Sequence, residues 1–433
     1  MKPVEDVSGA DLVRRSLAAV WHPCTQMKAH ERFPLVAIDR GEGPWLVDFE
    51  GRRYLDAVSS WWVNLFGHAH PEINAAIVGQ LGRLEHAMLA GFTHEPAVLL
   101  AERLSRLAPG RLGHAFFASD GASATEIALK MAFHYWANRG QPGKQRFLAL
   151  AGGYHGETVG ALAVTDVPVF RDAYAPLLRE ALLVPFPGEA GAIEALEALL
   201  AARHGEIAAL IVEPLVQGAS GMRMYSAAWL TRARELCSRH EVLLIADEIM
   251  TGFGRTGSLF ACEQAGVEPD LLCLSKGITG GYLPLSCVLA TDTVYEAFYD
   301  DDTARGFLHS HSYTGNPLAC RAALAVLDLF ERDRVIESNR EKAARFTRAA
   351  APLAAHPSVQ NFRRLGMIWA FEVATRTPHF AREAFALALE HGVLLRPIGT
   401  TVYFMPPYVI GDDEFARLVE AGLAIARHFG ETP

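Results

Sequence analysis

The amino-acid sequence predicts an α/β fold with a large, mostly parallel sheet and a second, smaller α+β domain. Between about residues 98 and 290, short apolar runs alternate with helix-like segments. The apolar runs are hydrophobic at consecutive positions, as expected of strands that are buried on both faces of a parallel sheet. A chain of 433 residues is also too long for one simple core, so two or more domains are expected.

The predicted strands of the central region are five apolar runs, at 114–119, 146–150, 208–214, 242–249 and 271–278. Helix-like segments lie between them, for example at 124–137 and 227–239. This alternation of strands and helices is typical of βαβ units, in which successive strands lie parallel in one sheet.

The two ends of the chain differ from this central region. Residues 1–66 are richer in Pro, Gly and short β-like pieces, and from Asn316 onward two long helical patterns precede a strand-like stretch at 401–405. We expect residues 67–320 to form the large domain. Residues 1–66 and 321–433 should together form the smaller α+β domain.

The composition excludes several classes of protein. The net charge of −9 offers no basic surface for nucleic acid. No apolar run reaches the roughly 18 residues of a membrane span, and the first residues lack the apolar core of a signal peptide. The six cysteines lie far apart without the spacing of metal ligands. We therefore expect a cytoplasmic protein that binds no metal, nucleic acid or membrane.

Two of the predicted strands end in charged residues that suggest a cofactor. Asp247 lies near the end of one run and Lys276 near the end of the next. A lone charge at the rim of a buried strand is costly to desolvate, so each should have a partner or a chemical task. A lysine can form a Schiff base and an aspartate can hold a pyridinium nitrogen, which are the two requirements of pyridoxal phosphate. The pair therefore suggests an enzyme that uses pyridoxal phosphate.

The segment Ser119–Ala137 could bind the phosphate of that cofactor. A strand runs into SerAspGlyAlaSer, and an amphipathic helix follows. Gly121 permits a tight turn, and the N–H groups at a helix N-terminus bind anions. An ordinary helix cap explains the segment as well when it is taken alone. The phosphate interpretation is favoured only because the Lys and Asp pair is also present.

Further polar and aromatic motifs are candidates for ligand contacts. In GlyGlyTyrHisGlyGlu at 152–157, Tyr154 could stack on a heteroaromatic ring, whereas His155 and Glu157 could equally be loop residues. Glu213, at a strand end, could cap the strand or pair with an active-site arginine. The candidate arginines are Arg255 and Arg396, because a guanidinium group grips a carboxylate with two hydrogen bonds.

Two other stretches suit the lining of a pocket. Adjacent residues of an extended segment point to opposite faces, so one of Trp61 and Trp62 could be core and the other could line a cleft. Both being core is the alternative. The stretch LeuHisSerHisSerTyrThrGlyAsnPro at 308–317 could be a solvated turn or could offer hydroxyl groups to a phosphate.

Over nearly its whole length the chain resembles the class III, fold-type I aminotransferases. The class pattern is LeuIleAlaAspGluIle at 244–249, GlyPheGlyArgThrGly at 252–257 and LeuSerLysGly at 274–277. Within the class, the chain is similar to the adenosylmethionine-8-amino-7-oxononanoate aminotransferases of biotin synthesis. That similarity rests on TrpHisPro at 21–23, SerSerTrpTrp at 59–62, ValGlnGlyAlaSerGlyMetArgMetTyr at 216–225 and TyrPheMetProProTyr at 403–408.

The resemblance implies roles for the matching residues. Lys276 would bind pyridoxal phosphate covalently and move a proton, and Asp247 would keep the pyridine nitrogen protonated. Ser312 would reach the phosphate of the neighbouring subunit, so the active sites would be shared in a homodimer. The other cofactor contacts would be Gly121, Ala122, Tyr154 and His311. The substrate contacts would be Trp61, Trp62, Tyr154, Glu157, Arg255, Ser310, Arg396 and Cys24.

The resemblance also implies a reaction, the transfer of an amino group to 8-amino-7-oxononanoate to give 7,8-diaminononanoate. S-adenosyl-L-methionine is the favoured donor, because a Trp-lined pocket suits an adenine ring and a sulfonium cation. Lysine as donor, an ω-amino acid or diamine aminotransferase, and a regulatory domain that binds the cofactor without catalysis are the alternatives. One departure concerns the pocket: Cys24 stands where the family commonly has an aromatic residue.

Overall fold

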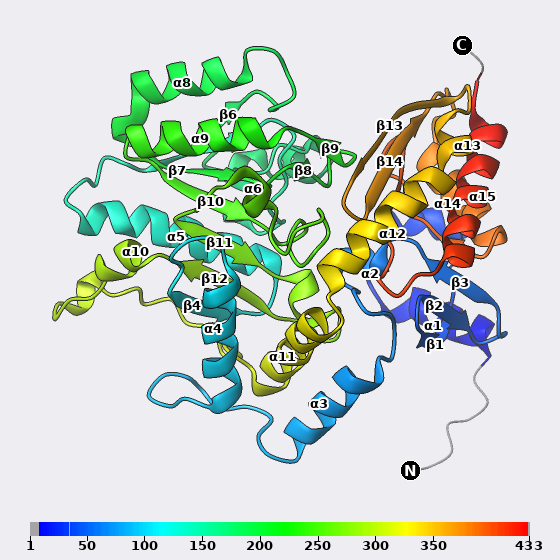
Figure 1. Cartoon of the computed structure of the whole chain (residues 1–433), viewed down its shortest axis with the longest axis horizontal. Helices are drawn as coiled ribbons and strands as arrows, with labels where there is room; N and C mark the ends of the chain where they lie inside the picture. Colours follow the sequence, from blue (N-terminus) through cyan, green and yellow to red (C-terminus); the bar gives the residue numbers. More distant parts are fainter. Residues whose placement is uncertain (1–7, 34, 432–433) are drawn as a thin grey trace. The chain divides into compact units, whose positions relative to one another are not determined.

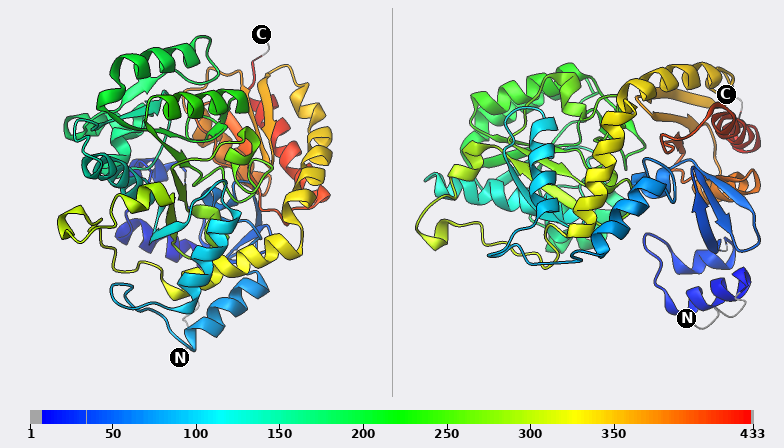
Figure 2. Two further views of the ribbon diagram at one scale, coloured as in Figure 1. Left: turned by 60° about the vertical axis from the view of Figure 1, so that its left-hand side comes forward. Right: turned by 60° about the horizontal axis from the view of Figure 1, so that its bottom comes forward.

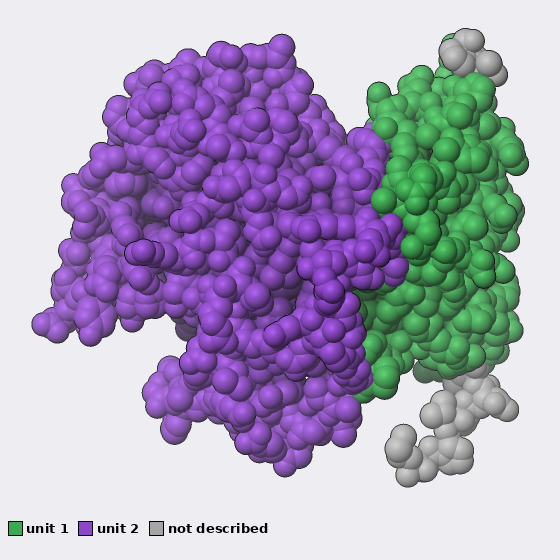
Figure 3. Space-filling view, viewed as in Figure 1, with its two compact units in different colours: residues 1–71, 344–362, 369–433 green, residues 72–343, 363–368 purple. Residues whose placement is uncertain are grey.

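The structure is a computed structural model that describes residues 8–33 and 35–431. The chain divides into two compact units, coloured separately in Figure 3. The smaller unit consists of Met1–Pro71, Ala344–Phe362 and Trp369–Pro433, and the larger one of Glu72–Ala343 and Arg363–Ile368. The domain boundaries expected from the sequence, after residues 66 and 320, stay predictions.

The larger unit is built on a seven-stranded sheet with the order β4-β12-β11-β10-β7-β5-β6. β10 is parallel to both β7 and β11, and β5 is parallel to both β6 and β7. Only β12 runs antiparallel to its two neighbours in this sheet. The predicted α/β fold with a mostly parallel sheet is confirmed. The strands are β4 (His114–Ala118), β5 (Arg146–Leu150), β6 (Leu182–Val184), β7 (Ile207–Val212), β10 (Leu243–Asp247), β11 (Leu271–Leu274) and β12 (Ser286–Ala290).

The five strands predicted in the central region are all present, and two others were not predicted. β6 has three residues at the edge of the sheet, which is too short for a hydrophobic pattern to be distinctive. β12 follows β11 without an intervening α-helix, so it does not fit the βαβ rhythm. The run at 271–278 also ends earlier than predicted, because the chain turns into a 3₁₀-helix (Lys276–Thr279).

Helices cover both faces of this sheet (Figures 1 and 2). α5 (Gly121–Asn138) packs against β4, β7, β10, β11 and β12, and its apolar residues share one core with Ile245 and Cys273. The next residues along these strands, Leu244 and Leu272, are equally buried. Because successive strand residues point to opposite faces, the sheet is buried on both sides.

The remaining helices of the larger unit surround this core. α8 and α9 pack together, as do α4 and α11 (Figures 1 and 2). A two-stranded sheet, β8 (Val216–Gln217) and β9 (Arg223–Met224), lies outside the main one. The other helices are α3 (Pro71–Leu81), α4 (Glu95–Leu107), α6 (Val159–Ala163), α7 (Pro168–Arg171), α8 (Ala192–Arg203), α9 (Ala227–Arg239), α10 (Asp292–Glu296) and α11 (Pro317–Arg332). α12 (Val335–Ala349) begins in the larger unit, and its residues from Ala344 onward belong to the smaller one.

The smaller unit joins segments from both ends of the chain through backbone pairing. Its four-stranded sheet has the order β1-β2-β3-β15, and β15 from the C-terminal segment lies parallel to β3. A second sheet has the order β13-β14-β16. The strands are β1 (Ile38–Glu42), β2 (Trp45–Asp48), β3 (Arg53–Asp56), β13 (Val359–Leu365), β14 (Ile368–Val373), β15 (Val393–Leu394) and β16 (Thr401–Phe404). The helices are α1 (Gly9–Ala19), α2 (Ser59–Trp62), α13 (Ala351–Ala354), α14 (Phe380–Glu390) and α15 (Asp412–Phe429).

No helix within residues 8–33 and 35–431 is long and apolar enough to cross a membrane. In the same part of the chain, no group of His, Cys, Asp and Glu side chains could hold a metal ion.

Gly366, in the turn between β13 and β14, should tolerate no side chain. Its φ is +54°, and a Cβ there would lie 2.3 Å from the carbonyl carbon of Thr256 and 2.4 Å from the nitrogen of Gly257. We expect Gly366→Ala to destabilise the protein by about 3 kcal/mol, because backbone atoms must move. Gly399 has a φ of +57° but no heavy atom within 4 Å, so Gly399→Ala should cost only about 1 kcal/mol of conformational strain. Equal shifts of the two thermal denaturation midpoints would contradict this prediction.

Candidate active site

Several polar side chains of the larger unit follow neighbouring strands at their carboxyl ends. Asp247 is the last residue of β10, and Lys276 comes two residues after β11. Glu213 follows β7 directly, and Tyr154 and His155 lie in the loop after β5. The carboxyl ends of parallel strands meet at one edge of the sheet, where α/β proteins commonly bind their ligands.

Asp247 is buried, with 4% of its surface exposed, and is held by two hydrogen bonds. Its Oδ2 lies 2.7 Å from Nδ1 of His155, and its Oδ1 accepts from the N–H of Ile249 at 3.1 Å. Since a carboxylate can only accept, Nδ1 of His155 carries the proton in this contact. The sequence alone is equally consistent with His155 as an ordinary loop residue, whereas the structure places it against Asp247.

The backbone around His155 is fixed by hydroxyl groups. Its N–H donates to Oγ1 of Thr165 at 3.0 Å, and its carbonyl accepts from Oγ1 of Thr125 at 2.9 Å. His155 is itself buried, and its Nε2 has no hydrogen-bond partner among the described residues. The imidazole is therefore held in place from its backbone and through Asp247.

Lys276 begins a 3₁₀-helix and has a φ of +46°, which is unusual for a residue other than glycine. Burial lowers the pKa of its ammonium group to about 8. The negative charges of Asp247 and Glu213 oppose this shift, and the positive charge of Arg255 adds to it. The neutral, nucleophilic amine of Lys276 is therefore far more populated near neutral pH than that of an ordinary lysine, whose pKa is 10.5.

Glu213 is buried beside this group, and burial raises the pKa of its carboxyl to about 7. The charge of His155 opposes the shift, and that of Asp247 reinforces it. Its two oxygens accept from the backbone N–H groups of Tyr154 and Gly218, each at 2.9 Å. Glu213 thus ties the loop after β5 to the chain that follows β7.

The other candidate residues near this edge differ in exposure. Arg255 is almost fully buried, with 1% of its surface exposed. The hydroxyl of Tyr154 donates to Oε1 of the exposed Glu157 at 2.9 Å, and the Tyr154 ring lies 5.3 Å from that of Phe170. The substrate contacts predicted for Arg255 and Glu157 stay predictions.

The predicted phosphate turn is the N-terminus of α5. Asp120 caps the helix by accepting from the N–H of Ser123 at 2.9 Å. Within the described ranges, the backbone N–H groups of Gly121 and Ala122 make no hydrogen bond, as is usual in the first turn of a helix. A Cβ on Gly121 would lie 3.0 Å from Cγ2 of Ile249, so the turn packs closely against the chain after β10.

The loop that contains Ser310, His311 and Ser312 lies beside this turn. Nε2 of His311 is 3.0 Å from Oγ of Ser119, and Oγ1 of Thr314 donates to the carbonyl of Phe117 at 2.8 Å. Ser310 and Ser312 are exposed.

These groups fit pyridoxal phosphate, the cofactor suggested by the sequence. The Asp247 carboxylate can accept from a protonated ring nitrogen, and Lys276 offers a neutral amine for its carbonyl carbon. The two free N–H groups at the start of α5 suit an anion such as its phosphate. All of these residues belong to the larger unit.

A second group of predicted residues gathers within the smaller unit. The guanidinium of Arg396 lies 4.3 Å from the centre of the Trp61 ring, and its Nη2 donates to the carbonyl of Cys24 at 3.3 Å. Trp62 is buried, and its Nε1–H donates to the hydroxyl of Tyr403 at 2.9 Å. Trp61 is 40% exposed, so one tryptophan is core and its neighbour is not. Beside Arg396 and Cys24 is a cavity of about 410 Å³.

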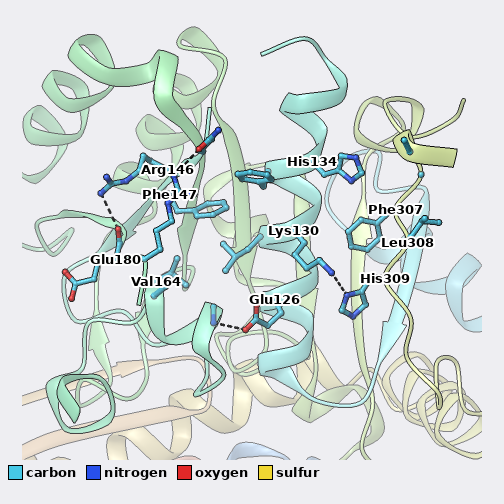
Figure 4. Close-up of a pocket in the computed structure, with 18 residues that line it drawn as sticks. Glu126, Lys130, His134, Arg146, Phe147, Val164, Glu180, Phe307, Leu308 and His309 are labelled. Atoms are coloured by element: carbon cyan, nitrogen blue, oxygen red, sulfur yellow. Dashed lines mark hydrogen bonds between the residues drawn. The ribbon is translucent and has the colours of Figure 1, made fainter. Parts of the chain in front are cut away.

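Another cavity, of about 570 Å³, opens on the larger unit along α5, with further walls from residues 145–147, 160–164 and 179–180 and from the segment 304–309 (Figure 4). Its walls include Phe133, Phe147 and Phe307. Nζ of Lys130 lies 2.9 Å from Nδ1 of His309 at its side. None of the site residues predicted from the sequence lines this cavity.

Comparison with known proteins identifies the family. Residues 26–424 match the model of the family described as aminotransferase class III. An adenosylmethionine-8-amino-7-oxononanoate aminotransferase of Helicobacter pylori is 45% identical, over 95% of this chain and 97% of that protein. The protein of the same name from Anoxybacillus flavithermus is 43% identical, over 91% of this chain and 92% of its own length.

Solved structures agree with this result. The crystal structure of an adenosylmethionine-8-amino-7-oxononanoate aminotransferase from Methanocaldococcus jannaschii has a TM-score of 0.93 and 36% identity, over 96% of this chain and 99% of that one. An amine transaminase of an uncultivated Pseudomonas species in a PLP-bound form has a TM-score of 0.89 and 34% identity, over 95% and 99% of the two chains. The chain belongs to the class III aminotransferase family.

Proposed function

We propose that this protein transfers an amino group to 8-amino-7-oxononanoate, giving 7,8-diaminononanoate for biotin synthesis, with pyridoxal phosphate as its cofactor. Full-length similarity to the Helicobacter pylori protein of that name supports the reaction. The observation that carries the proposal is the buried group at the carboxyl edge of the sheet, in which His155 holds the Asp247 carboxylate and burial lowers the pKa of Lys276 to about 8. A cytoplasmic location is part of the proposal, since all six cysteines are free thiols.

When bound, pyridoxal phosphate supplies an electron sink for the charge that develops as a substrate carbon loses its proton. Asp247 would accept a hydrogen bond from the ring nitrogen and favour its protonated form. Nζ of Lys276 would hold the cofactor and would accept the proton that the substrate carbon loses. The N–H groups of Gly121 and Ala122 would bind the phosphate, and the aromatic ring of Tyr154 would contact the cofactor ring.

Arg396 and Trp61 are the central substrate-binding residues of the proposal. Arg396 binds the carboxylate of 8-amino-7-oxononanoate, because it is the guanidinium that lies on the exposed Trp61 ring. S-adenosyl-L-methionine is the proposed donor, since the same exposed ring suits a flat adenine or a sulfonium cation. The remaining members of the proposed set of substrate contacts are Trp62, Tyr154, Cys24, Ser310, Glu157 and Arg255.

We also propose that the protein is a homodimer with shared active sites, in which Ser312 reaches the phosphate of the neighbouring subunit. The segment that carries Ser312 exposes large apolar side chains, with Leu308 77% and Tyr313 64% exposed. Beside it lies the Phe-lined cavity of Figure 4. Exposed apolar surface of this kind marks association surfaces.

The donor assay tests the proposed reaction. Purified protein with 8-amino-7-oxononanoate should form 7,8-diaminononanoate with S-adenosyl-L-methionine and not with lysine, and Lys276→Ala should abolish product formation. Turnover with lysine alone would reassign the donor. Turnover only of ω-amino acids or diamines would assign a different aminotransferase, and no diaminononanoate from either donor would overturn the proposal.

The lowered pKa of Lys276 predicts how the free protein captures the cofactor. Because the neutral amine reacts, covalent attachment should become faster as the pH rises through about 8, rather than through the usual value of 10.5. The rate can be measured by trapping with borohydride and locating the modified peptide by mass spectrometry. Arg255→Gln should move the midpoint up, since the Arg255 charge lowers this pKa, and Asp247→Asn should move it down. A midpoint near 10 in the unaltered protein would contradict the prediction.

A charge on the exposed apolar segment should weaken the dimer. Leu308→Glu is expected to lower the molar mass from light scattering from two chains toward one and to reduce the affinity for pyridoxal phosphate, with an unchanged far-ultraviolet circular dichroism spectrum. Val409→Glu, at an apolar position of the smaller unit that is 42% exposed, serves as the control. A single-chain mass for the unaltered protein would refute the proposed homodimer.

A further inference from the structure

The turn that carries the two tryptophans has an unusual backbone. Ser59, Ser60, Trp61 and Trp62 have φ values of +52°, +45°, +74° and +75°. Elsewhere in the described part of the chain, residues other than glycine adopt positive φ only singly. Side chains disfavour this left-handed region. Such strain persists only where surrounding contacts fix the backbone, and it is concentrated at functional sites.

Asp56 provides these contacts. It is the last residue of β3, and its side chain is fully buried. Its Oδ1 accepts from the N–H of Ser60 at 2.9 Å and from that of Val58 at 3.3 Å. Its Oδ2 accepts from Oγ of Ser60 at 2.7 Å. The carboxylate therefore binds both the backbone and the side chain of the second residue of the turn.

His68 holds Asp56 from the other side. Its Nε2 lies 3.1 Å from Oδ2 of Asp56, and its Nδ1 lies 3.2 Å from Nδ2 of Asn64. Oδ1 of Asn64 accepts from the N–H of Gly67 at 2.7 Å, which fixes the orientation of the amide. Because an amide nitrogen can only donate, Nδ1 of His68 is an acceptor and its Nε2–H donates to Asp56.

Two further contacts tie the turn to the segment around β16. Oγ of Ser59 donates to the carbonyl of Met405 at 2.7 Å, and the indole of Trp62 donates to Tyr403. The Trp61 ring is the one that these contacts leave exposed, and it lies 4.3 Å from the Arg396 guanidinium.

A buried carboxylate can also hold a turn for stability alone, and Asp48 shows how. It accepts from the N–H groups of Glu50 and Arg52 and from the hydroxyl of Tyr54, in the turn between β2 and β3. That turn has a glycine, Gly51, at its positive φ of +80°. The turn held by Asp56 contains no glycine, so it retains strain that a glycine would remove and presents an aromatic ring instead.

We propose that Asp56, supported by His68, is a positioning residue that keeps the Ser59–Trp62 turn left-handed and thereby places Trp61 under Arg396. The inference rests on the proposed function, in which Arg396 binds the carboxylate of the amino acceptor. Asp56 touches neither substrate nor cofactor. Its effect is to aim the guanidinium, and so to set the preference for an acceptor that bears a carboxylate.

The first test compares Asp56→Asn with Asp48→Asn. This change replaces one carboxylate oxygen of Asp56 by an NH₂ group, which donates and cannot accept. The hydrogen bonds from Ser60 and His68 can then no longer all be made. We expect the KM for 8-amino-7-oxononanoate to rise roughly 10-fold with little change in kcat. The preference for this acceptor over the same amino ketone without its carboxylate should fall by a similar factor. Asp48→Asn should lower the thermal denaturation midpoint and leave both quantities unchanged.

A milder pair of variants separates strain from the loss of a hydrogen bond. Ser60→Ala and Ser60→Gly both remove the hydroxyl that donates to Asp56, but only glycine adopts a φ of +45° without a penalty. Ser60→Ala should reproduce the change in KM seen with Asp56→Asn, and Ser60→Gly should stay closer to the unaltered protein. This pair keeps the test valid if Asp56→Asn does not fold.

The outcomes distinguish this inference from the function on which it rests. If the unaltered protein does not aminate 8-amino-7-oxononanoate, the proposed function fails. If it does, but the Asp56 and Ser60 variants retain the KM and the preference of the unaltered protein, the positioning role is refuted and the function stands. A fall in kcat alone, with KM and preference unchanged, would refute it equally.

Discussion

Ionisable side chains lie buried where the parallel strands of the larger unit end, and each must be stabilised without bulk water. Asp247 is stabilised by His155 and a backbone N–H, and Glu213 by two backbone N–H groups. The negative charges of Asp247 and Glu213 offset only part of the desolvation of the Lys276 ammonium group, which is why its pKa falls to about 8. Removing these ionised groups from water costs free energy of folding. The same desolvation makes the Lys276 amine more nucleophilic near neutral pH.

The smaller unit also contains buried carboxylates, but there they fix the backbone of turns. Asp48 and Asp56 are both buried carboxylates that accept from backbone N–H groups of the residues after them. At Asp48 these bonds close a turn that contains glycine, and the backbone there is relaxed. At Asp56 the hydrogen bonds hold the turn Ser59–Trp62, whose four residues all have positive φ, a backbone conformation that costs about 1 kcal/mol or more for each residue. This conformation leaves the Trp61 ring exposed beside Arg396.

The sequence predicts the parts of the fold and site that depend on local pattern. Buried strands such as β10 and β11 are recognisable because their residues are continuously apolar, and Asp247 and Lys276 interrupt that pattern. The partner of Asp247 is not predictable in this way, because His155 lies 92 residues away in the chain. The left-handed turn is hidden for another reason: SerSerTrpTrp contains no glycine, the usual sign of positive φ.

The position of Cys24 shows why a change of residue type in a pocket need not alter charge recognition. Arg396 contacts the carbonyl of Cys24 rather than its thiol. A hydrogen bond to the backbone survives any substitution that keeps the same backbone conformation, and Cys24 adopts a φ of +50°. A thiol in place of the aromatic ring that the family resemblance leads us to expect therefore leaves the support of the guanidinium intact. What it changes is the space beside Arg396, where the cavity of about 410 Å³ lies, and hence the shape of the molecule that can be accommodated there.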